Sequence, residues 1–186
     1  MSKRTILKSA VAVGLVAGVV TGLSLWGKVS FRARMYSTIA GAPPVNVKIE
    51  IGEYSPAEDI QKLNDALIKG DEEGFYRQLR SLNKGSLQFI GGLGLNIKFN
   101  VIQEQSTDKG LKIFLLTESR SVEPGTTRMK NLPWRFLVAV LELDKDFNGE
   151  GLIYEDAIVD FLAQGLIEMK SSFSTPKSLV NVKLVK

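Results

Sequence analysis

The sequence predicts an α+β protein: an antiparallel β-sheet, folded as a sandwich or a partial barrel, with an inserted αα-hairpin. Three observations predict this fold. Several segments after residue 44 alternate apolar and polar residues, which is typical of half-buried strands. Residues 55–85 have helical periodicity instead. Turn residues then recur at the spacing that is typical of sandwiches and barrels.

The N-terminus has the pattern of a targeting segment. Lys3, Arg4 and Lys8 precede an uncharged run of 19 residues, 9–27. A cleaved signal has an apolar core of about 7–15 residues and a spanning helix needs about 17–25. Cleavage after Gly27 or Ala33 would put a bulky residue three positions back, and Ala42 lies far from the run. Residues 1–34 are therefore predicted to be a signal peptide or an N-terminal membrane anchor, and we favour the anchor.

This segment places the protein in the cell envelope. We expect a domain anchored in the inner membrane and facing the periplasm or the outside, or a secreted domain if the signal is cleaved. Residues 35–44 contain Gly41 and a Pro pair and are predicted to be a linker. Residues 45–186 are predicted to form a single β-rich extracytoplasmic domain.

Composition excludes several classes of function. Residues 1–34 hold six Lys and Arg and no acid, so residues 35–186 hold 18 basic and 20 acidic groups. A near-neutral domain argues against nucleic acid, and against anionic lipid, as a partner of the folded part. The chain has no Cys and no His, which removes His-dependent nucleophilic catalysis and His-ligated metals. The composition favours a role without catalysis.

The first elements of the domain are predicted from local patterns. Residues 45–51 alternate without interruption and predict a strand. Ser55 to Glu58 has the form of a capping box with Pro56 at the first helical position. The helix that follows is expected to end at Gly70. Asp71 is expected to cap a second helix that ends before Gly85.

From residue 86 the period changes to two, and the remaining chain predicts strands. They are expected at 95–101, 111–117, 135–143, 151–161, 166–172 and 178–185, with a long polar loop over 119–133. After Arg135, residues 135–143 are apolar on both faces except Glu142, as expected of a central strand.

Short motifs in a fixed order carry a resemblance to a known family. They are Tyr36-Ser37-Thr38, the helical pair, Leu93-Gly94, and Leu141-Glu142-Leu143-Asp144 leading to Gly149-Glu150-Gly151. In this order the chain resembles a family of uncharacterised exported bacterial proteins. The resemblance implies export and a single β-rich domain over residues 35–186, and it implies no activity, ligand or catalytic residue.

One segment matches a metal-binding pattern. Asp144, Asp146 and Asn148, with Gly149 and Glu155, satisfy the calcium-loop spacing D-x-[DN]-x-[DN]-G-x5-E. Such oxygen ligands suit Ca²⁺. However, the segment before the loop has strand character, and Asp and Asn before Gly are also typical of tight β-hairpins. We favour the hairpin turn and keep Ca²⁺ as the alternative.

Three functions are compatible with these observations. The first is a membrane-tethered, non-catalytic interaction module with an unknown protein partner. The second is a carrier of a small apolar ligand in a cavity of the β-domain. The third is a calcium-dependent module or a carboxylate-based enzyme that uses residues 144–155. No catalytic residue and no cofactor other than Ca²⁺ is predicted.

Overall fold

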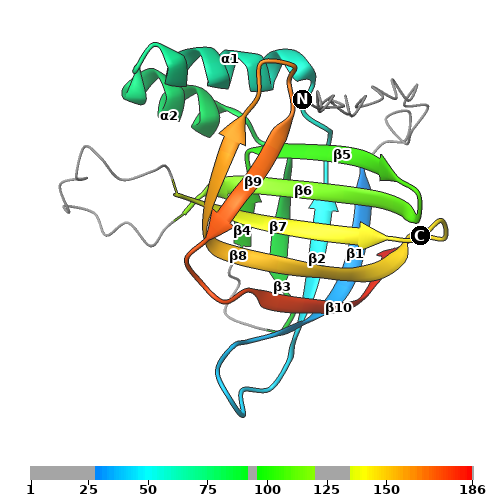
Figure 1. The fold of residues 1–186 in the computed structure, drawn as a ribbon. Helices are drawn as coiled ribbons and strands as arrows, with labels where there is room; N and C mark the ends of the chain where they lie inside the picture. The colour runs from blue at the N-terminus through cyan, green and yellow to red at the C-terminus, as the bar shows by residue number, and fades with distance from the viewer. Residues whose placement is uncertain (1–27, 92–95, 120–134, 186) are drawn as a thin grey trace, which may run out of the picture.

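The structure of the protein is a computed structural model that describes residues 28–91, 96–119 and 135–185. The apolar run 9–27 and most of the loop predicted over 119–133 lie outside these residues. The described part is mostly antiparallel sheet, curled into a nearly closed barrel, with two helices against it (Figure 1). The predicted α+β class and the partial barrel are confirmed.

The described elements follow in chain order. The helices are α1 (Ala57–Ile68) and α2 (Glu72–Ser81). The first strands are β1 (Val29–Tyr36), β2 (Val45–Ile51), β3 (Gly85–Phe89), β4 (Asn96–Phe99) and β5 (Val101–Thr107). The others are β6 (Gly110–Glu118), β7 (Arg135–Leu143), β8 (Asn148–Phe161), β9 (Ile167–Ser172) and β10 (Lys177–Val185).

The sheet has the strand order β4-β3-β2-β1-β10-β8-β7-β6-β5, and β9 pairs with β8 outside this path. Its two end strands, β4 and β5, are consecutive in the chain and are separated by Asn100. The Asn100 N–H donates to the Leu116 carbonyl at 2.9 Å, and its side-chain amide donates to the Leu82 carbonyl at 2.7 Å. The Thr117 hydroxyl donates to the Asn100 side-chain oxygen at 2.6 Å.

The sequence predicts one strand over 95–101, but the corner at Asn100 divides this segment between β4 and β5. The alternation is continuous there, but the chain passes at Asn100 from pairing with β3 to pairing with β6. Local periodicity cannot indicate a change of pairing partner, because the partners are distant in sequence.

The sheet also begins earlier than the sequence indicates. Residues 28–34 are predicted as the flank of the targeting segment and 35–44 as a linker, whereas β1 pairs with β2 on one side and β10 on the other. Phe31, Ala33 and Met35 of β1 are buried. β1 is therefore an interior strand of the sheet, and Arg32 and Arg34 belong to the folded domain.

Side chains on the concave side of the sheet form the inner cluster. It contains Phe31, Ala33, Met35, Val47, Ile49, Ile51, Leu87, Phe99, Ile102, Ile113, Leu115, Ala139, Leu141, Leu143, Ile153, Leu179 and Val182. Each contributing strand alternates between this interior and the outer surface, as its burial pattern requires. The side chains of the inner cluster point into the barrel and form its core.

A second, outer cluster lies between the convex side of the sheet and the helices. Ile60 and Leu63 of α1 and Phe75 and Leu79 of α2 pack on residues of β5 to β9. Phe75, Phe136 and Phe161 meet edge to face, with ring centroids 5.5–6.1 Å apart. The second half of β8 and β9 form an arm (residues 157–172) that completes this cluster.

The two helices begin differently from each other. Asp71 caps α2 as predicted, and its carboxylate accepts the Gly74 N–H at 2.8 Å. The predicted capping box at α1 is wrong, because the Ser55 side chain makes no cap bond and Pro56 is the N-cap. The Ser55 hydroxyl accepts the Ile102 N–H at 3.0 Å instead, which fastens the start of α1 to β5.

Candidate functional site

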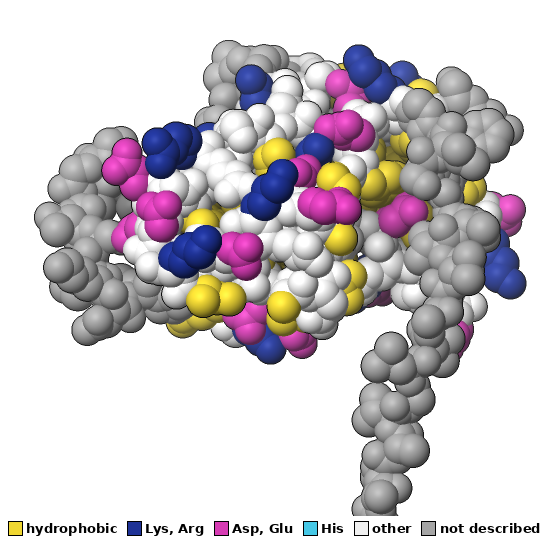
Figure 2. Space-filling view, turned by 90° about the horizontal axis from the view of Figure 1, so that it is seen from above, with side chains coloured by type: hydrophobic (Ala, Val, Ile, Leu, Met, Phe, Trp, Pro, Cys, Tyr) yellow, Lys and Arg dark blue, Asp and Glu magenta, His cyan; other side chains and the backbone are white. Residues whose placement is uncertain are grey.

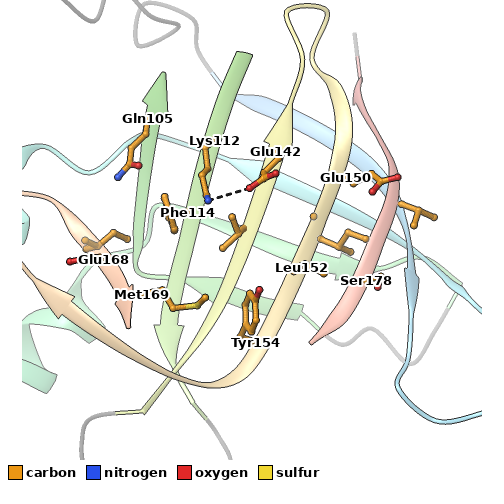
Figure 3. Close-up of a pocket in the computed structure, with 15 residues that line it drawn as sticks. Gln105, Lys112, Phe114, Glu142, Glu150, Leu152, Tyr154, Glu168, Met169 and Ser178 are labelled. Carbon is orange, nitrogen blue, oxygen red and sulfur yellow. Dashed lines mark ion pairs between the residues drawn. The ribbon is translucent and has the colours of Figure 1, made fainter. Parts of the chain in front are cut away.

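The outer cluster covers only part of the convex side of the sheet, and a groove opens beside it. The groove has a volume of about 510 Å³ and lies next to β9, on the outer faces of β6, β7, β8 and β10. We call it the β9 groove. Figure 3 shows its floor strands side by side, with β9 and the bend of β8 at one end.

The floor of the β9 groove is apolar. Alternate residues of β6, β7 and β8 point outward here, because the neighbouring positions point into the barrel. They include Phe114, Val140, Leu152 and Tyr154. Leu152 is 36% exposed, while Phe114 and Val140 are buried beneath the surface. Met169 of β9 extends toward this floor (Figure 3).

One wall of the groove is an unpaired strand edge. Among the described strands, β9 pairs with β8 alone. The Leu162 N–H donates to the Leu166 carbonyl at 2.8 Å, so the backbone groups of Leu166 and Glu168 face β8. Because an antiparallel ladder alternates, the backbone groups of Ile167 and Met169 face away from β8, along the groove.

Polar side chains around the groove are mostly acidic. Glu142, Glu150 and Glu168 line it together with a single basic residue, Lys112. Lys112 pairs with Glu142 at 3.2 Å, and its amine lies 5.4 Å from the centroid of the Phe114 ring. Glu168 pairs with Lys170 at 3.0 Å, so Glu150 is the lining carboxylate without an ion pair among the described residues. This negative charge favours a basic partner.

Gln103 of β5 holds the tip of the arm in place. This buried amide donates to the Gly165 carbonyl at 2.8 Å and accepts the Ile167 N–H at 2.9 Å. Gly165 has φ of +78°, and a Cβ there would lie 2.5 Å from the Cβ of Ala57. Only glycine combines this backbone conformation with such a close approach to α1. The position of β9, and with it the groove wall, depends on these contacts.

A second candidate site lies at the end of the barrel, where Tyr54 and Glu104 meet. Burial raises the pKa of Glu104, while the hydrogen bond with Tyr54 acts in the opposite direction. Burial and the Glu104 carboxylate raise the pKa of the Tyr54 hydroxyl. The Glu104 Oε2 atom is buried and has no hydrogen-bond partner. A carboxylate beside a phenol can hold a proton, but no nucleophile or further acid-base group lies with it among the described residues.

The helical face is a weaker candidate. Figure 2 shows it from above, with basic and acidic side chains mixed across it and only small hydrophobic areas between them. On α1 the exposed charges include Glu58, Lys62 and Asp65. Such a mixed surface is typical of solvated helices and presents no single-sign or apolar surface to a ligand.

The residues of the predicted calcium loop are not brought together. Asp144, Asp146 and Asn148 lie in the tight turn between β7 and β8, where one Asp144 oxygen accepts the N–H groups of Asp146 and Asn148 at 2.9 Å. Glu155 lies seven residues further along β8, roughly 23 Å at the rise of a strand, and pairs with Lys177.

The hairpin interpretation therefore describes this segment. The calcium loop does not form because strands, not helices, flank the turn, so the chain does not wrap back around a central ion. Among the described residues no group of three or more Asp, Glu, His or Cys side chains is placed to hold a metal ion.

Comparisons with protein-family models, with curated proteins and with solved structures gave no significant match. Neither helix of the described part is long and apolar enough to cross a membrane. The case for function therefore depends on the site geometry and on the sequence.

Sequence reasoning identified none of the residues of the β9 groove as a site. Phe114, Val140 and Leu152 are apolar residues of predicted strands, and which face is covered depends on the path of the arm. One sequence pattern did point to this region. Residues 135–143 are mainly apolar on both faces of the strand, which indicates that its outer face is covered as well as its inner face.

Proposed function

We propose that the protein is a non-catalytic binding module, tethered to the membrane through residues 1–27, that holds an extended peptide segment of a partner protein in the β9 groove. The observation that carries the proposal is an apolar groove with an unpaired strand edge as its wall. Peptides bind such edges by adding a strand, where main-chain bonds supply affinity and pockets for alternate side chains supply specificity.

The groups around the groove indicate which kind of peptide would bind. The Met169 N–H and the carbonyls of Ile167 and Met169 are available to an added strand, while the Ile167 N–H is held by Gln103. Alternate peptide side chains would contact the apolar floor at Phe114 and Leu152. The Glu150 carboxylate supports Lys or Arg at the intervening positions.

The exposed side chains of the arm support selective use of this edge. Lys170 pairs with Glu168 at 3.0 Å and with Asp160 at 3.4 Å. Charged side chains on an edge strand discourage unselective pairing between sheets. The edge therefore favours a segment whose charges match, rather than any exposed strand.

The predicted carrier of a small apolar ligand remains as a second candidate. The volume of about 510 Å³ lies in the range of small-molecule sites. This ligand would bind in the β9 groove, whose floor is apolar.

The test measures binding of a synthetic octapeptide of alternating Val and Lys to the full chain. A second peptide carries Pro at its centre, which removes a backbone donor. We expect the first peptide to bind and the Pro peptide to bind at least about tenfold more weakly, which is a loss of about 1.4 kcal/mol in binding free energy. Leu152→Gln should reduce the affinity for the first peptide by a similar factor.

Leu166→Gln is the matched control, since Leu166 is 39% exposed and lies outside the groove. If both peptides bound with equal affinity to the wild type, Leu152→Gln and Leu166→Gln, strand addition would be refuted. An uncharged fluorescent fatty-acid analogue that binds in a Leu152-dependent manner, while neither peptide binds, would favour the apolar-ligand candidate instead.

A further inference from the structure

The outer surface of β1 and β10 carries cations without partners. Arg32, Arg34 and Lys183 are exposed and line a hollow of about 700 Å³ together with Asn46 and Asn181. None of the described residues that line this hollow is acidic. Among the described residues, none of these three cations takes part in an ion pair. We call Arg32, Arg34 and Lys183 the basic face.

The register places like charges directly opposite one another. Arg32 lies opposite Lys183 on β10 and opposite Lys48 on β2. Like charges in directly opposed positions destabilise a sheet. Lys48 is compensated by Glu50, with 2.6 Å between the paired atoms, but Arg32 and Lys183 are not. An anion bound between them would remove this repulsion.

A β-bulge produces the juxtaposition. Leu179 and Val182 both point into the barrel, although three positions separate them, because the register shifts between them. Asn181 in this bulge has φ of +53°, which is uncommon for a residue other than glycine. In a regular strand Lys183 would share the inward face of Leu179. The extra residue turns Lys183 outward, onto the face of Arg32.

The position of the basic face in the chain indicates what lies opposite it. The apolar run ends at Gly27 and β1 begins at Val29. Arg32 follows Lys28 by four residues, about 13 Å along an extended strand. A run held in hydrocarbon would keep this face close to the lipid headgroups. Lys and Arg side chains near an anionic membrane surface are attracted to it.

From this geometry we infer that the basic face docks on the phosphate groups of anionic phospholipids. This inference rests on the membrane tether of the proposed function. Guanidinium groups bind phosphate oxygens in a bidentate manner, and the Asn46 and Asn181 amides can donate to the same oxygens. The domain then lies with β1 against the membrane, while the floor of the β9 groove on β6, β7 and β8 stays open to a partner.

The experiment reconstitutes the full chain in phosphatidylcholine vesicles with and without phosphatidylglycerol. A membrane-impermeant amine reagent labels exposed lysines, and mass spectrometry compares Lys183 with Lys69 at the end of α1, which is also exposed. We expect phosphatidylglycerol to slow the labelling of Lys183 several-fold relative to Lys69. We expect high salt to reverse this protection, because screening weakens attraction between exposed charges.

Matched variants identify the groups responsible. Arg32→Gln with Arg34→Gln should abolish the protection of Lys183, whereas Lys98→Gln, at an exposed position of β4, should leave it intact. Circular dichroism melting of each variant checks that it is folded.

Three results would overturn the inference. Equal labelling of Lys183 in both vesicle types refutes membrane docking while the tether stands. Protection by inorganic phosphate in phosphatidylcholine vesicles, equal to that by phosphatidylglycerol, assigns the face to a soluble anion instead. Protein that stays outside the vesicle fraction refutes the tether of the proposed function, and the docking with it.

Discussion

The inner and outer clusters are closed in different ways. The inner cluster is enclosed by a nearly continuous ring of hydrogen-bonded strands. The outer cluster is covered by two helices and the arm, which reach the barrel through a few polar contacts such as those of Ser55 and Gln103. The barrel therefore provides the stable scaffold, and the outer layer shapes the surface, because the β9 groove begins where the outer layer ends.

Loss of β1 tests the inner cluster most severely. Cleavage after Ala33 or Ala42 would remove most or all of a strand that pairs on both sides. The deletion also removes Phe31, Ala33 and Met35 from the inner cluster. We expect a chain that starts at Val45 to lose cooperative unfolding, because native stability is only about 5–15 kcal/mol.

A chain that starts at Lys28 is the control and should melt cooperatively by circular dichroism. A cooperative transition in the chain that starts at Val45 would contradict the interior position of β1. For the same reason, signal cleavage is compatible with this fold after Gly27, because β1 would then stay intact.

Matched Phe→Ala substitutions compare the two clusters directly. Phe99 of the inner cluster and Phe75 of the outer cluster are both fully buried, so each substitution should cost about 3–5 kcal/mol. The effects should differ in location. Phe75→Ala should speed hydrogen exchange in α1 and α2 while the barrel strands stay protected, whereas Phe99→Ala should speed exchange throughout. The same exchange pattern in both variants would show that the two layers unfold as one unit.

Gln103→Ala tests how the arm is attached. The substitution leaves the Gly165 carbonyl and the Ile167 N–H without their partner, which should cost about 1–3 kcal/mol. It should also lower the affinity for the octapeptide, because β9 supplies the groove wall. Gln105→Ala, two positions along the same face of β5, is the control for stability measured by urea unfolding. A loss in Gln105→Ala as large as that in Gln103→Ala would mean that the arm is held elsewhere.

Glu104 gives the smallest effect and a pH dependence. Its pKa in the folded protein lies above the ordinary value of 4.5. The folded state therefore gains stability from this group below about pH 4.5, and that gain is lost as the pH rises through the folded pKa. Glu104→Gln resembles the protonated form and should raise the melting temperature by a few degrees at pH 7.

The difference between Glu104→Gln and the wild type should shrink toward pH 4, which melting curves across this range can measure. A melting temperature at pH 7 that falls in the variant would mean that the ionised carboxylate is stabilised by Tyr54 more than burial penalises it.

Much of the fold follows from local sequence patterns. The alternation over 45–51 corresponds residue for residue to β2, and the double-faced pattern over 135–143 to β7. The helices and the cap at Asp71 were predicted as well. These features are local, because side-chain periodicity and capping depend on neighbours a few positions away.

β1 shows where local reasoning has its limit. Phe31, Ala33 and Met35 alternate with Arg32 and Arg34, which is a strand pattern, but basic residues after an apolar run also match the flank of an anchor. The pattern does not distinguish the two, since only pairing with β2 and β10 makes the segment a strand.

By itself, the sequence determined the class of the fold, the position of most elements, the absence of His and Cys chemistry and an N-terminal run suited to a membrane. Only the tertiary structure decided the corner at Asn100, the path of the arm, the open edge of β9 and the row of cations across β1. The physical reason is distance along the chain. These features arise where strands remote in sequence pair or cross, and the free energy of such contacts depends on the whole packed molecule.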